Sequence, residues 1–481
     1  MEEDYIKTRK SKIENLRSLG VDPYPARFVR THTSVQALKL KDGTKKVRLA
    51  GRLVLIRDMG RLTFAHILDG EGKIQIAFNE KDIGKDKYKF FNKNFDLGDF
   101  IGVDGKMFKT HKGEKTLLVN KFEMLTKALR PLPDKWHGIS DEEEKLRRRY
   151  LDIMMNPEVK DMIKKRSVFW NSIREFLLKK DFIEVETPVL ETTTGGADAR
   201  PFQTHHNALD MDVYLRISMG ELWQKRLMVG GLEKTFEIGR QFRNEGMSPE
   251  HLQDYTQVEF YMAYSDYTDG MKFVEELYKY VIKKTFGTLK FDIRGFKVDF
   301  SKKWEVYDYV KTIKKMTGID VLNTNLKQIE SKLKELKIDY EKKGFNITRA
   351  IDNLWKYCRK KIAGPGFLIN PPVTMEPLAK RSKENPELVQ RFQVLIAGSE
   401  VGKGYSELND PTDQAMRFAE QQKLRESGDE EAQMADYDFV EALEYGMPPT
   451  FGFGVSERLF GFLMNKTARE AQIFPLMKPR E

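Results

Sequence analysis

Cysteine is nearly absent from this sequence of 481 residues, which contains a single copy, Cys358. One thiol cannot form a disulfide within the chain, so a disulfide framework and a Cys-rich zinc site are both excluded. Long apolar runs are missing as well, and none approaches the roughly 18 residues that a membrane helix needs. The acidic start MEEDYIKTRK has no apolar segment of the kind found in secretory signals. We therefore expect a cytoplasmic protein that makes no contact with a membrane.

Glycine and proline are not enriched either. The 34 Gly and 18 Pro follow no Gly-X-Y period, which excludes collagen-like and low-complexity classes. Hydrophobic residues make up 40% and charged residues 32% of the chain, which is typical of a globular protein with a highly charged surface. Lys and Arg (83) outnumber Asp and Glu (73), and the net charge of +10 favours a polyanionic partner such as nucleic acid.

The N-terminal part of the chain predicts a helix followed by a small β-barrel. Residues 4–19 have apolar residues at helical spacing, and short alternating strands follow from 47 to 126. In KIQIAF, for example, Ile74 and Ile76 share one face and Gln75 lies on the other. Several short strands in about 80 residues, separated by glycine turns, indicate a barrel, and the OB-fold is the common nucleic-acid-binding version.

The second part of the chain predicts a larger α+β domain. It opens with a helix in which Phe169, Ile173, Phe176 and Leu177 fall on one side. Strands and helices of mixed period follow, so the fold class of the whole chain is α+β. The predicted boundaries are an N-terminal helical extension over 1–45, a barrel over 46–127, a linker over 128–144 and a second domain over 145–481, with a helical Lys-rich insert near 302–350.

The segment 235–264 predicts an antiparallel hairpin with one apolar and one polar face. The polar face holds an arginine that can grip a phosphate or a carboxylate in a planar fork. A solvated sheet face with salt bridges is the alternative. The predicted apolar face carries Phe236, Ile238, Phe242, Val258, Phe260, Met262 and Tyr264, and the polar face carries Arg243, Glu245, Gln257, Glu259 and Tyr261.

Three further segments contain residues that suit a binding site. In PPTFGFGVSER, Gly452 and Gly454 precede a helix that carries Arg458, which suits a phosphate or is simply a tight strand-to-helix turn. In AGSEVGKGYSELND, Glu400 and Glu407 flank glycine turns and could hold a metal, an ammonium or only water. In GGADARPFQTHHNALD, adjacent histidines point apart, so structural or hydrogen-bonding roles are favoured over a metal site.

Together these segments resemble one enzyme family over nearly the whole chain. FLLKKDFIEVETPVL, FRNEG…TQVEFY and GFGVSER are similar to the three motifs of class II aminoacyl-tRNA synthetases. GGADARPFQTHHNALD, EPLAKR, GYSELNDPTDQ and ALRPLPDKWHG resemble the lysyl-tRNA synthetases of that class in particular. The resemblance implies an OB-fold anticodon-binding domain and a catalytic domain with an antiparallel sheet flanked by helices. It also implies ATP-dependent formation of lysyl-adenylate, release of pyrophosphate, transfer of the lysyl group to tRNA(Lys), a requirement for Mg²⁺, and a homodimer formed around the helix before Pro188.

The resemblance implies roles for individual residues of the second domain. Arg243, Arg458 and Glu400 are the expected catalytic residues, which hold the α-phosphate, the γ-phosphate and Mg²⁺ respectively. The expected ATP site also includes Glu245, His251 and Tyr255. The expected lysine site consists of Gly196, Glu221, Arg243, Glu259, Tyr261, Tyr405 and Glu407, and the expected metal ligands are Glu400 and Glu407.

In the barrel, the resemblance implies an anticodon site made of Arg57, Phe64, Gln75 and Glu114. Phe64 would stack on the central uridine and Gln75 would hydrogen-bond to its edge, as is usual for unpaired RNA bases. Phe64 as an ordinary core residue is the alternative.

The sequence departs from the family pattern at a few positions. Gln393 stands where an acidic residue near the metal is usual, which leaves the number of Mg²⁺ ions open. Lys403 replaces a usual Asn, and its charge would repel a substrate ammonium unless Glu400 or Glu407 pairs with it or unless it points at phosphate. Leu252 stands where an Asn usually follows the histidine.

The third motif is one residue shorter than usual and ends in Ser-Glu-Arg, as in the aspartyl and asparaginyl branch. An aspartyl- or asparaginyl-type synthetase therefore remains an alternative, as does a non-catalytic, synthetase-derived RNA-binding protein. The many acids of the expected pocket favour a cationic substrate on physical grounds alone.

Overall fold

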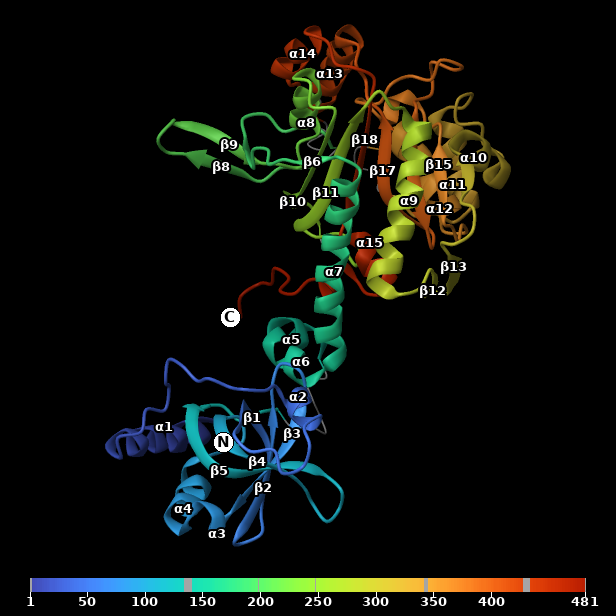
Figure 1. Ribbon diagram of the computed structural model, residues 1–481. Helices are drawn as coiled ribbons and strands as arrows, with labels where there is room; N and C mark the ends of the chain where they lie inside the picture. Colours follow the sequence, from blue (N-terminus) through green and yellow to red (C-terminus); the bar gives the residue numbers. More distant parts are fainter. Residues whose placement is uncertain are drawn as a thin grey trace. The chain divides into compact units, whose positions relative to one another are not determined.

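The computed structural model describes residues 2–133, 141–197, 199–246, 248–340, 345–426 and 433–480. The chain divides into two units, Met1–Ser140 and Asp141–Glu481 (Figure 1). The predicted linker falls partly on residues 134–140, which lie outside the described residues. No helix among the described residues is long and apolar enough to span a membrane.

The first unit is built around a closed β-barrel, which confirms the predicted OB-type fold. Ile74, Ile76 and Phe78 are fully buried, whereas Lys73 and Gln75 on the other face of the same strand are not. The strands close in the order β1-β2-β3-β5-β4. Their bounds are β1 (Val47–Asp58), β2 (Leu62–Leu68), β3 (Lys73–Asn79), β4 (Phe100–Lys109) and β5 (Lys115–Thr126).

Lys127, directly after β5, is a fully buried cation of this unit. Its ammonium donates to Asp99 Oδ2 and to the carbonyl oxygen of Asn94, each at 2.7 Å. These acceptors offset the loss of water that burial of a charge entails. The helices of the unit are α1 (Glu2–Ser18), where the sequence predicts one, α2 (Ser34–Leu38), α3 (Glu80–Ile83) and α4 (Lys85–Asn94).

The second unit contains a large, mainly antiparallel sheet. Within the described residues its strand order is β14-β15-β16-β17-β18-β11-β10-β6, and only the two edge strands pair in parallel. The bounds are β6 (Ile183–Glu184), β10 (Lys234–Phe242), β11 (Asp254–Ala263), β14 (Glu305–Asp308), β15 (Gly366–Ile369), β16 (Arg391–Ile396), β17 (Ser399–Ser406) and β18 (Thr450–Ser456).

The predicted hairpin is formed by β10 and β11, which pair Phe236 with Phe260. Both phenylalanines are fully buried in the core of the unit, as the alternation predicts. The prediction was wrong for Tyr264, which lies beyond the strand with a positive φ of 59° and is 68% exposed. Because β10 ends at Phe242, Arg243 starts the connecting loop and does not extend the strand face.

Two long helices, α7 (Pro157–Lys179) and α9 (Tyr267–Phe286), pack side by side against the sheet (Figure 1). Pro157 occupies the first turn of α7, where its missing N–H is tolerated. Asp266 caps α9 by accepting from two backbone N–H groups, and Gly287 ends it with a φ of 73°. The residues predicted for the apolar side of the first helix are buried: Phe169, Ile173, Phe176 and Leu177.

The helices α10 (Tyr309–Thr317) and α11 (Leu326–Glu335) lie within the range 302–350 of the expected insert, and α12 (Ile347–Arg359) begins there. These helices lie beside the edge of the sheet that β14 and β15 form (Figure 1). These helices enclose a core of their own, in which the rings of Tyr309 and Trp355 lie 5.3 Å apart. Residues 341–344 of the insert lie outside the described residues.

The remaining elements surround the large sheet. His205 and His206 lie on β8, and His205 Nδ1 bonds Asp212 at 3.1 Å, in keeping with the predicted hydrogen-bonding role. These elements are α5 (Glu142–Arg147), α6 (Arg149–Met155), β7 (Leu190–Glu191), β8 (Gln203–His206), β9 (Met211–Leu215), α8 (Glu221–Val229), β12 (Lys290–Ile293), β13 (Phe296–Asp299), η1 (Val373–Met375), α13 (Pro411–Glu426), α14 (Tyr437–Glu444), α15 (Arg458–Leu463) and α16 (Ala468–Ala471).

Candidate active site

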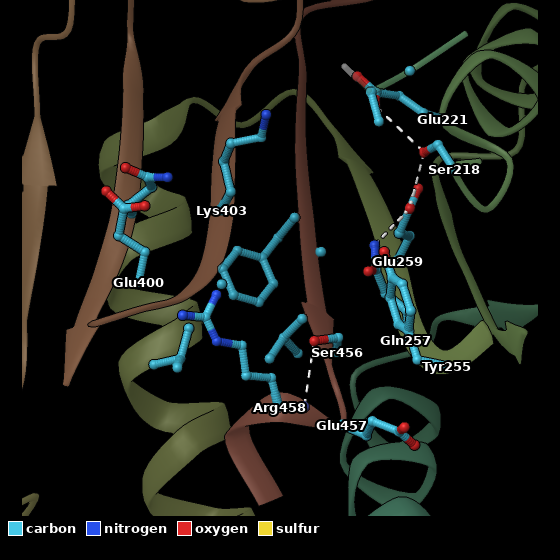
Figure 2. Close-up of a pocket in the computed structure, with 18 of the residues that line it drawn as sticks. Ser218, Glu221, Tyr255, Gln257, Glu259, Glu400, Lys403, Ser456, Glu457 and Arg458 are labelled. Carbon is cyan, nitrogen blue, oxygen red and sulfur yellow. Dashed lines mark hydrogen bonds between the residues drawn. The ribbon is translucent and has the colours of Figure 1, made fainter. Parts of the chain in front are cut away.

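A cavity of about 400 Å³ lies over the strands β11, β17 and β18 (Figure 2). Its wall gathers side chains from segments that are far apart in the sequence, which is typical of a ligand site. All the residues of the second unit that the sequence assigns to ATP, lysine or metal line this one cavity: Gly196, Glu221, Arg243, Glu245, His251, Tyr255, Glu259, Tyr261, Glu400, Tyr405, Glu407 and Arg458.

The two glycines of the last motif make room for side chains of neighbouring strands. A Cβ on Gly452 would collide with Glu407 Oε1 and with the ring of Tyr261. A Cβ on Gly454 would lie 3.0 Å from Gln257 Nε2. Both glycines belong to the regular strand β18, so the predicted glycine turn is replaced by a strand that leads directly into α15.

Glu259 is a buried carboxylate held by neutral donors. Its Oε1 accepts from Ser218 Oγ at 3.0 Å, the backbone N–H of Met219 at 3.0 Å, Gln241 Nε2 at 2.9 Å and Gln257 Nε2 at 2.8 Å. Burial raises the pKa of this carboxyl group. Part of the network is visible in Figure 2. The other oxygen, Oε2, accepts only a long hydrogen bond of 3.4 Å from Tyr261 Oη, and a carboxylate oxygen can accept more than one partner.

Glu221 and Glu407 form a second acidic group in the cavity wall. Tyr405 Oη donates to Glu221 Oε1. Burial raises the pKa of Glu221 to about 7 and that of Glu407 to about 8. Both carboxylates also contact the buried ammonium of Lys225, a residue that the sequence analysis did not single out. Its spacing of four residues from Glu221 on a helix was the signal that could have revealed it.

The opposite end of the cavity is cationic. Arg458, at the start of α15, pairs with Glu250, which also pairs with Arg294. The guanidinium of Arg243 lies 5.7 Å from the ring centre of Tyr255, and its Nε donates to a backbone carbonyl at 3.3 Å. Two arginines around one cavity suit a polyphosphate.

His251 also lines this cationic end. Its Nδ1 lies 2.7 Å from Ser248 Oγ. Burial, and then the charge of Arg458, lower the pKa of the imidazole. The ring is therefore neutral at physiological pH and can take part in hydrogen bonds as donor and acceptor.

Glu400 is the carboxylate of the cavity wall that best suits a metal ion. Its Oε1 accepts from the indole Nε1 of Trp355 at 2.5 Å. In the described part of the chain, no three His, Cys, Asp or Glu side chains are grouped so that they could hold a metal ion. Mg²⁺ does not require such a group, because it is often bound through one or two carboxylates together with substrate phosphates and water.

Three of the four barrel residues, Arg57, Phe64 and Gln75, lie on strands, and Glu114 directly precedes β5. Arg57 and Phe64 are cross-strand partners on β1 and β2. Phe64 is half-buried between the fully buried Thr63 and Ala65, so its ring turns outward rather than into the core. Gln75 Nε2 donates to Glu114 Oε2 at 2.7 Å.

His66 belongs to the same face, although the sequence analysis did not name it. It is the cross-strand partner of Gln75, and its Nε2 lies 3.1 Å from Glu114 Oε1. The alternation of β2 would have indicated it, because His66 follows Phe64 by two residues.

Comparison with known families accounts for both units. Residues 141–478 match the model of tRNA synthetases class II (D, K and N), and residues 47–125 match that of the OB-fold nucleic acid binding domain. The chain belongs to the class II tRNA synthetases. The family match covers more than two thirds of the sequence and includes every residue of the cavity wall.

Three proteins of similar sequence belong to one subgroup of this family, the lysine–tRNA ligases. The lysine–tRNA ligase of Thermotoga maritima is 44% identical over 491 aligned residues, which cover 100% of this chain and 97% of that protein. The lysine–tRNA ligase of Carboxydothermus hydrogenoformans is 45% identical, with 99% of each chain covered. The lysine–tRNA ligase of Thermosipho africanus is 44% identical over 100% of this chain and 97% of its own.

The positive charge of Lys403 is balanced by a carboxylate other than those expected from the sequence. The ammonium pairs with Glu376 at 3.2 Å rather than with Glu400 or Glu407. Arg391 pairs with the other oxygen of Glu376 at 2.8 Å, so this carboxylate balances two cations. Lys403 is also the cross-strand partner of Gln393, which places the two unusual residues side by side.

Proposed function

We propose that this synthetase is a lysine–tRNA ligase, which activates L-lysine with ATP and transfers it to tRNA(Lys). The observation that carries the proposal is the identity of 44–45% to lysine–tRNA ligases over essentially the whole chain. The acidic cavity supports it independently, because an ammonium side chain fits carboxylates that would repel aspartate. The aspartyl and asparaginyl alternatives are therefore not favoured.

The reaction has two steps. In the first, a carboxylate oxygen of lysine attacks the α-phosphorus of ATP, a P–O bond forms, and the bond to pyrophosphate breaks. In the second, a hydroxyl of the terminal tRNA ribose attacks the carbonyl carbon and AMP leaves. We propose that Arg243 holds the α-phosphate and the lysine carboxylate and that Arg458 holds the γ-phosphate. Their part is positioning and charge neutralisation, which suffices for phosphoryl chemistry of this kind.

Three further residues complete the proposed ATP site. Tyr255, whose ring lies near Arg243, supplies a flat surface on which adenine can stack. Glu245 and His251 lie in the wall on the same side and suit the amino group and the phosphates of ATP. The non-catalytic alternative is disfavoured because Arg243, Glu245 and Arg458 are all present at one cavity.

Glu400 fits Mg²⁺ because its carboxylate belongs to the wall of the cavity that also contains Arg243 and Arg458. Figure 2 shows Glu400 and Arg458 in this wall. The ion supplies charge neutralisation to the phosphates when it is bound. Glu407 is a weaker candidate for this role, since it contacts the ammonium of Lys225. With Gln393 uncharged, Glu400 is the carboxylate we propose as the protein's Mg²⁺ ligand.

For the substrate lysine, we propose two separate sets of contacts. Gly196 and Glu259 receive the α-amino group, and the network of donors on Glu259 fixes its orientation. Glu221 and Glu407 receive the side-chain ammonium. Tyr261 and Tyr405 border the channel between them, and Tyr405 is fixed by its hydrogen bond to Glu221.

The barrel is proposed to read the anticodon. Phe64 offers a partly exposed ring for stacking, and Gln75 is held in place by hydrogen bonds to Glu114 and from Thr116, the latter at 2.7 Å. Arg57, across from Phe64, suits the phosphate backbone.

A homodimer is proposed from apolar side chains around the first motif. Large hydrophobic residues on an exposed surface usually mark an interface, and a self-complementary one gives a symmetric dimer. The single cysteine is in keeping with a cytoplasmic location. The exposed hydrophobic residues are Val168, Leu178, Ile183, Val189 and Leu190.

The deciding experiment is ATP–pyrophosphate exchange with Mg²⁺ and each of the twenty amino acids. Exchange with lysine alone is expected, followed by charging of tRNA(Lys). Exchange with aspartate or asparagine would move the protein to the neighbouring branch. The variant Arg243→Ala should abolish both exchange and charging, and persistent exchange would show that the proposed site is wrong.

A further inference from the structure

Lys225 is completely buried at the end of the cavity that holds Glu221 and Glu407. It lies one helical turn after Glu221 on α8, and its Nζ is 3.5 Å from Glu221 Oε1. The same Nζ is in direct contact with Glu407 Oε2. The ring centres of Tyr405 and Phe439 lie 5.6 and 5.8 Å from it, so that aromatic faces replace part of its lost hydration.

This ammonium is separated from the substrate space. Glu221, Tyr405 and Glu407 line the cavity, whereas Lys225 is not among the described residues of its wall. A resident lysine therefore lies behind the carboxylates that we propose to bind the side-chain ammonium of a substrate lysine. Stability alone is a weak reason for such a cluster, because well-packed apolar residues often stabilise a core equally well.

Glu221 and Glu407 each place one oxygen near Lys225 and the other beside a glycine of the cavity wall. Glu221 uses Oε1 for Tyr405 and Lys225, while its Oε2 accepts a long hydrogen bond of 3.5 Å from Ser218 Oγ and lies beside Gly196, where a Cβ would meet it at 2.9 Å. Glu407 uses Oε2 for Lys225, while its Oε1 lies over Gly452, where a Cβ would collide with it. Both glycines line the cavity, so the second oxygen of each carboxylate lies at the cavity wall.

We propose that Lys225 is a positioning residue that sets the specificity for lysine. It orients one oxygen of Glu221 and one of Glu407 into the cavity and reduces their joint charge to that of a single carboxylate. A substrate ammonium that bridges Glu221 Oε2 and Glu407 Oε1 then completes a neutral group of four alternating charges. This inference rests on the proposed function, because it takes the substrate to be lysine.

Lys403 does not perform this task, although it lies in the same cavity. Its side chain is 42% exposed and its ammonium pairs with Glu376. Figure 2 shows its side chain coming from β17 into the cavity, well separated from Arg458. Its charge also acts to lower the pKa of Glu221, but less than that of Lys225, because Lys403 is partly exposed and has Glu376 as its own partner.

The test replaces Lys225 by Met, which keeps the length of the side chain and removes its charge. Steady-state ATP–pyrophosphate exchange at saturating ATP should give a lysine KM raised by about tenfold or more, the size expected when a charge-assisted contact is lost. The KM for ATP and kcat should change by no more than about twofold, because Lys225 touches neither ATP nor the reacting atoms. Lys127→Met, which removes the other fully buried lysine described above, should leave the lysine KM within about twofold of the wild type.

A second variant guards against a failure of Lys225→Met to fold. Lys225→Gln keeps a donor for Glu407 without the charge, and circular dichroism on the full chain shows which variants are folded. A folded variant with a lysine KM within about twofold of the wild type would overturn the inference, as would a parallel rise of the KM values for lysine and ATP. Wild-type protein that does not activate lysine would instead refute the proposed function, so the two failures are distinguishable.

Discussion

Trp355 Nε1 donates a 2.5 Å hydrogen bond to Glu400 Oε1. Trp355 is a buried residue of α12, just beyond the range 302–350 of the expected insert, whereas Glu400 lies on β17 in the cavity wall. The helix α12 therefore contacts the candidate metal ligand directly. A donor on one carboxylate oxygen fixes the orientation of the other, which is how neighbouring groups tune a metal site.

Trp355→Phe should weaken the binding of Mg²⁺ to the enzyme. The substitution keeps an aromatic ring in the core around α12 and removes the donor to Glu400, and contacts of this kind change metal affinity by about 10- to 100-fold. We expect the Mg²⁺ concentration for half-maximal exchange to rise by about tenfold, with the lysine KM unchanged. Exchange at a series of Mg²⁺ concentrations measures this, and an unchanged Mg²⁺ dependence would exclude a role for Glu400 as the metal ligand that Trp355 orients.

Lysine binding should depend on pH between about 6.5 and 8.5. Burial raises the pKa of Glu221 to about 7 and that of Glu407 to about 8, so both carboxyl groups bind protons at the lower end of this range. The substrate ammonium favours their ionised forms, so binding releases protons and the lysine KM should fall as the pH rises. Exchange assays at saturating ATP give this profile, and a flat lysine KM across the range would contradict it.

Lys403→Met should have a small effect, in contrast to Lys225→Met. Glu376 keeps Arg391 as a partner at 2.8 Å after the lysine is removed, so no carboxylate is left unpaired. Loss of a screened like charge should lower the lysine KM by about twofold at most. A lysine KM raised by about tenfold in this variant would instead show that Lys403 contacts the substrates.

Phe64→Ala should weaken tRNA charging and leave lysine activation intact. Base stacking on an aromatic ring contributes about 1–3 kcal/mol, so the KM for tRNA should rise by roughly 5- to 150-fold. Exchange without tRNA serves as the internal control. Phe100→Ala is a matched variant, because Phe100 stacks with Arg52 at 4.3 Å on another pair of barrel strands. An equal loss of charging in both variants would argue for general damage to the barrel.

The sequence alone predicted many of the local elements and proposed the candidate site residues. Alternation by two predicted which side of β3 is buried, and helical spacing predicted the apolar side of α7, because these periods follow from backbone geometry. The motifs of the resemblance singled out twelve residues of the second unit, from Gly196 to Arg458, and all of them line one cavity. The ends of the strands were not predicted correctly, because a chain can leave a sheet while apolar and polar residues still alternate. Arg243 and Tyr264 continue the alternation, but each lies one residue beyond its strand.

Only the tertiary structure decided which charged and polar side chains contact one another. Tyr405 and Glu221 are 184 positions apart, and their hydrogen bond exists because β17 and α8 border one cavity. The partner of Lys403 is Glu376, the first residue of the EPLAKR segment, and the sequence did not indicate that these two residues pair. The sequence around Lys225 indicates only an ordinary helix residue. The fold buries its ammonium between Glu221 and Glu407. Ion pairs of this kind depend on which surfaces are brought together and deprived of water, and no local period in a sequence carries that information.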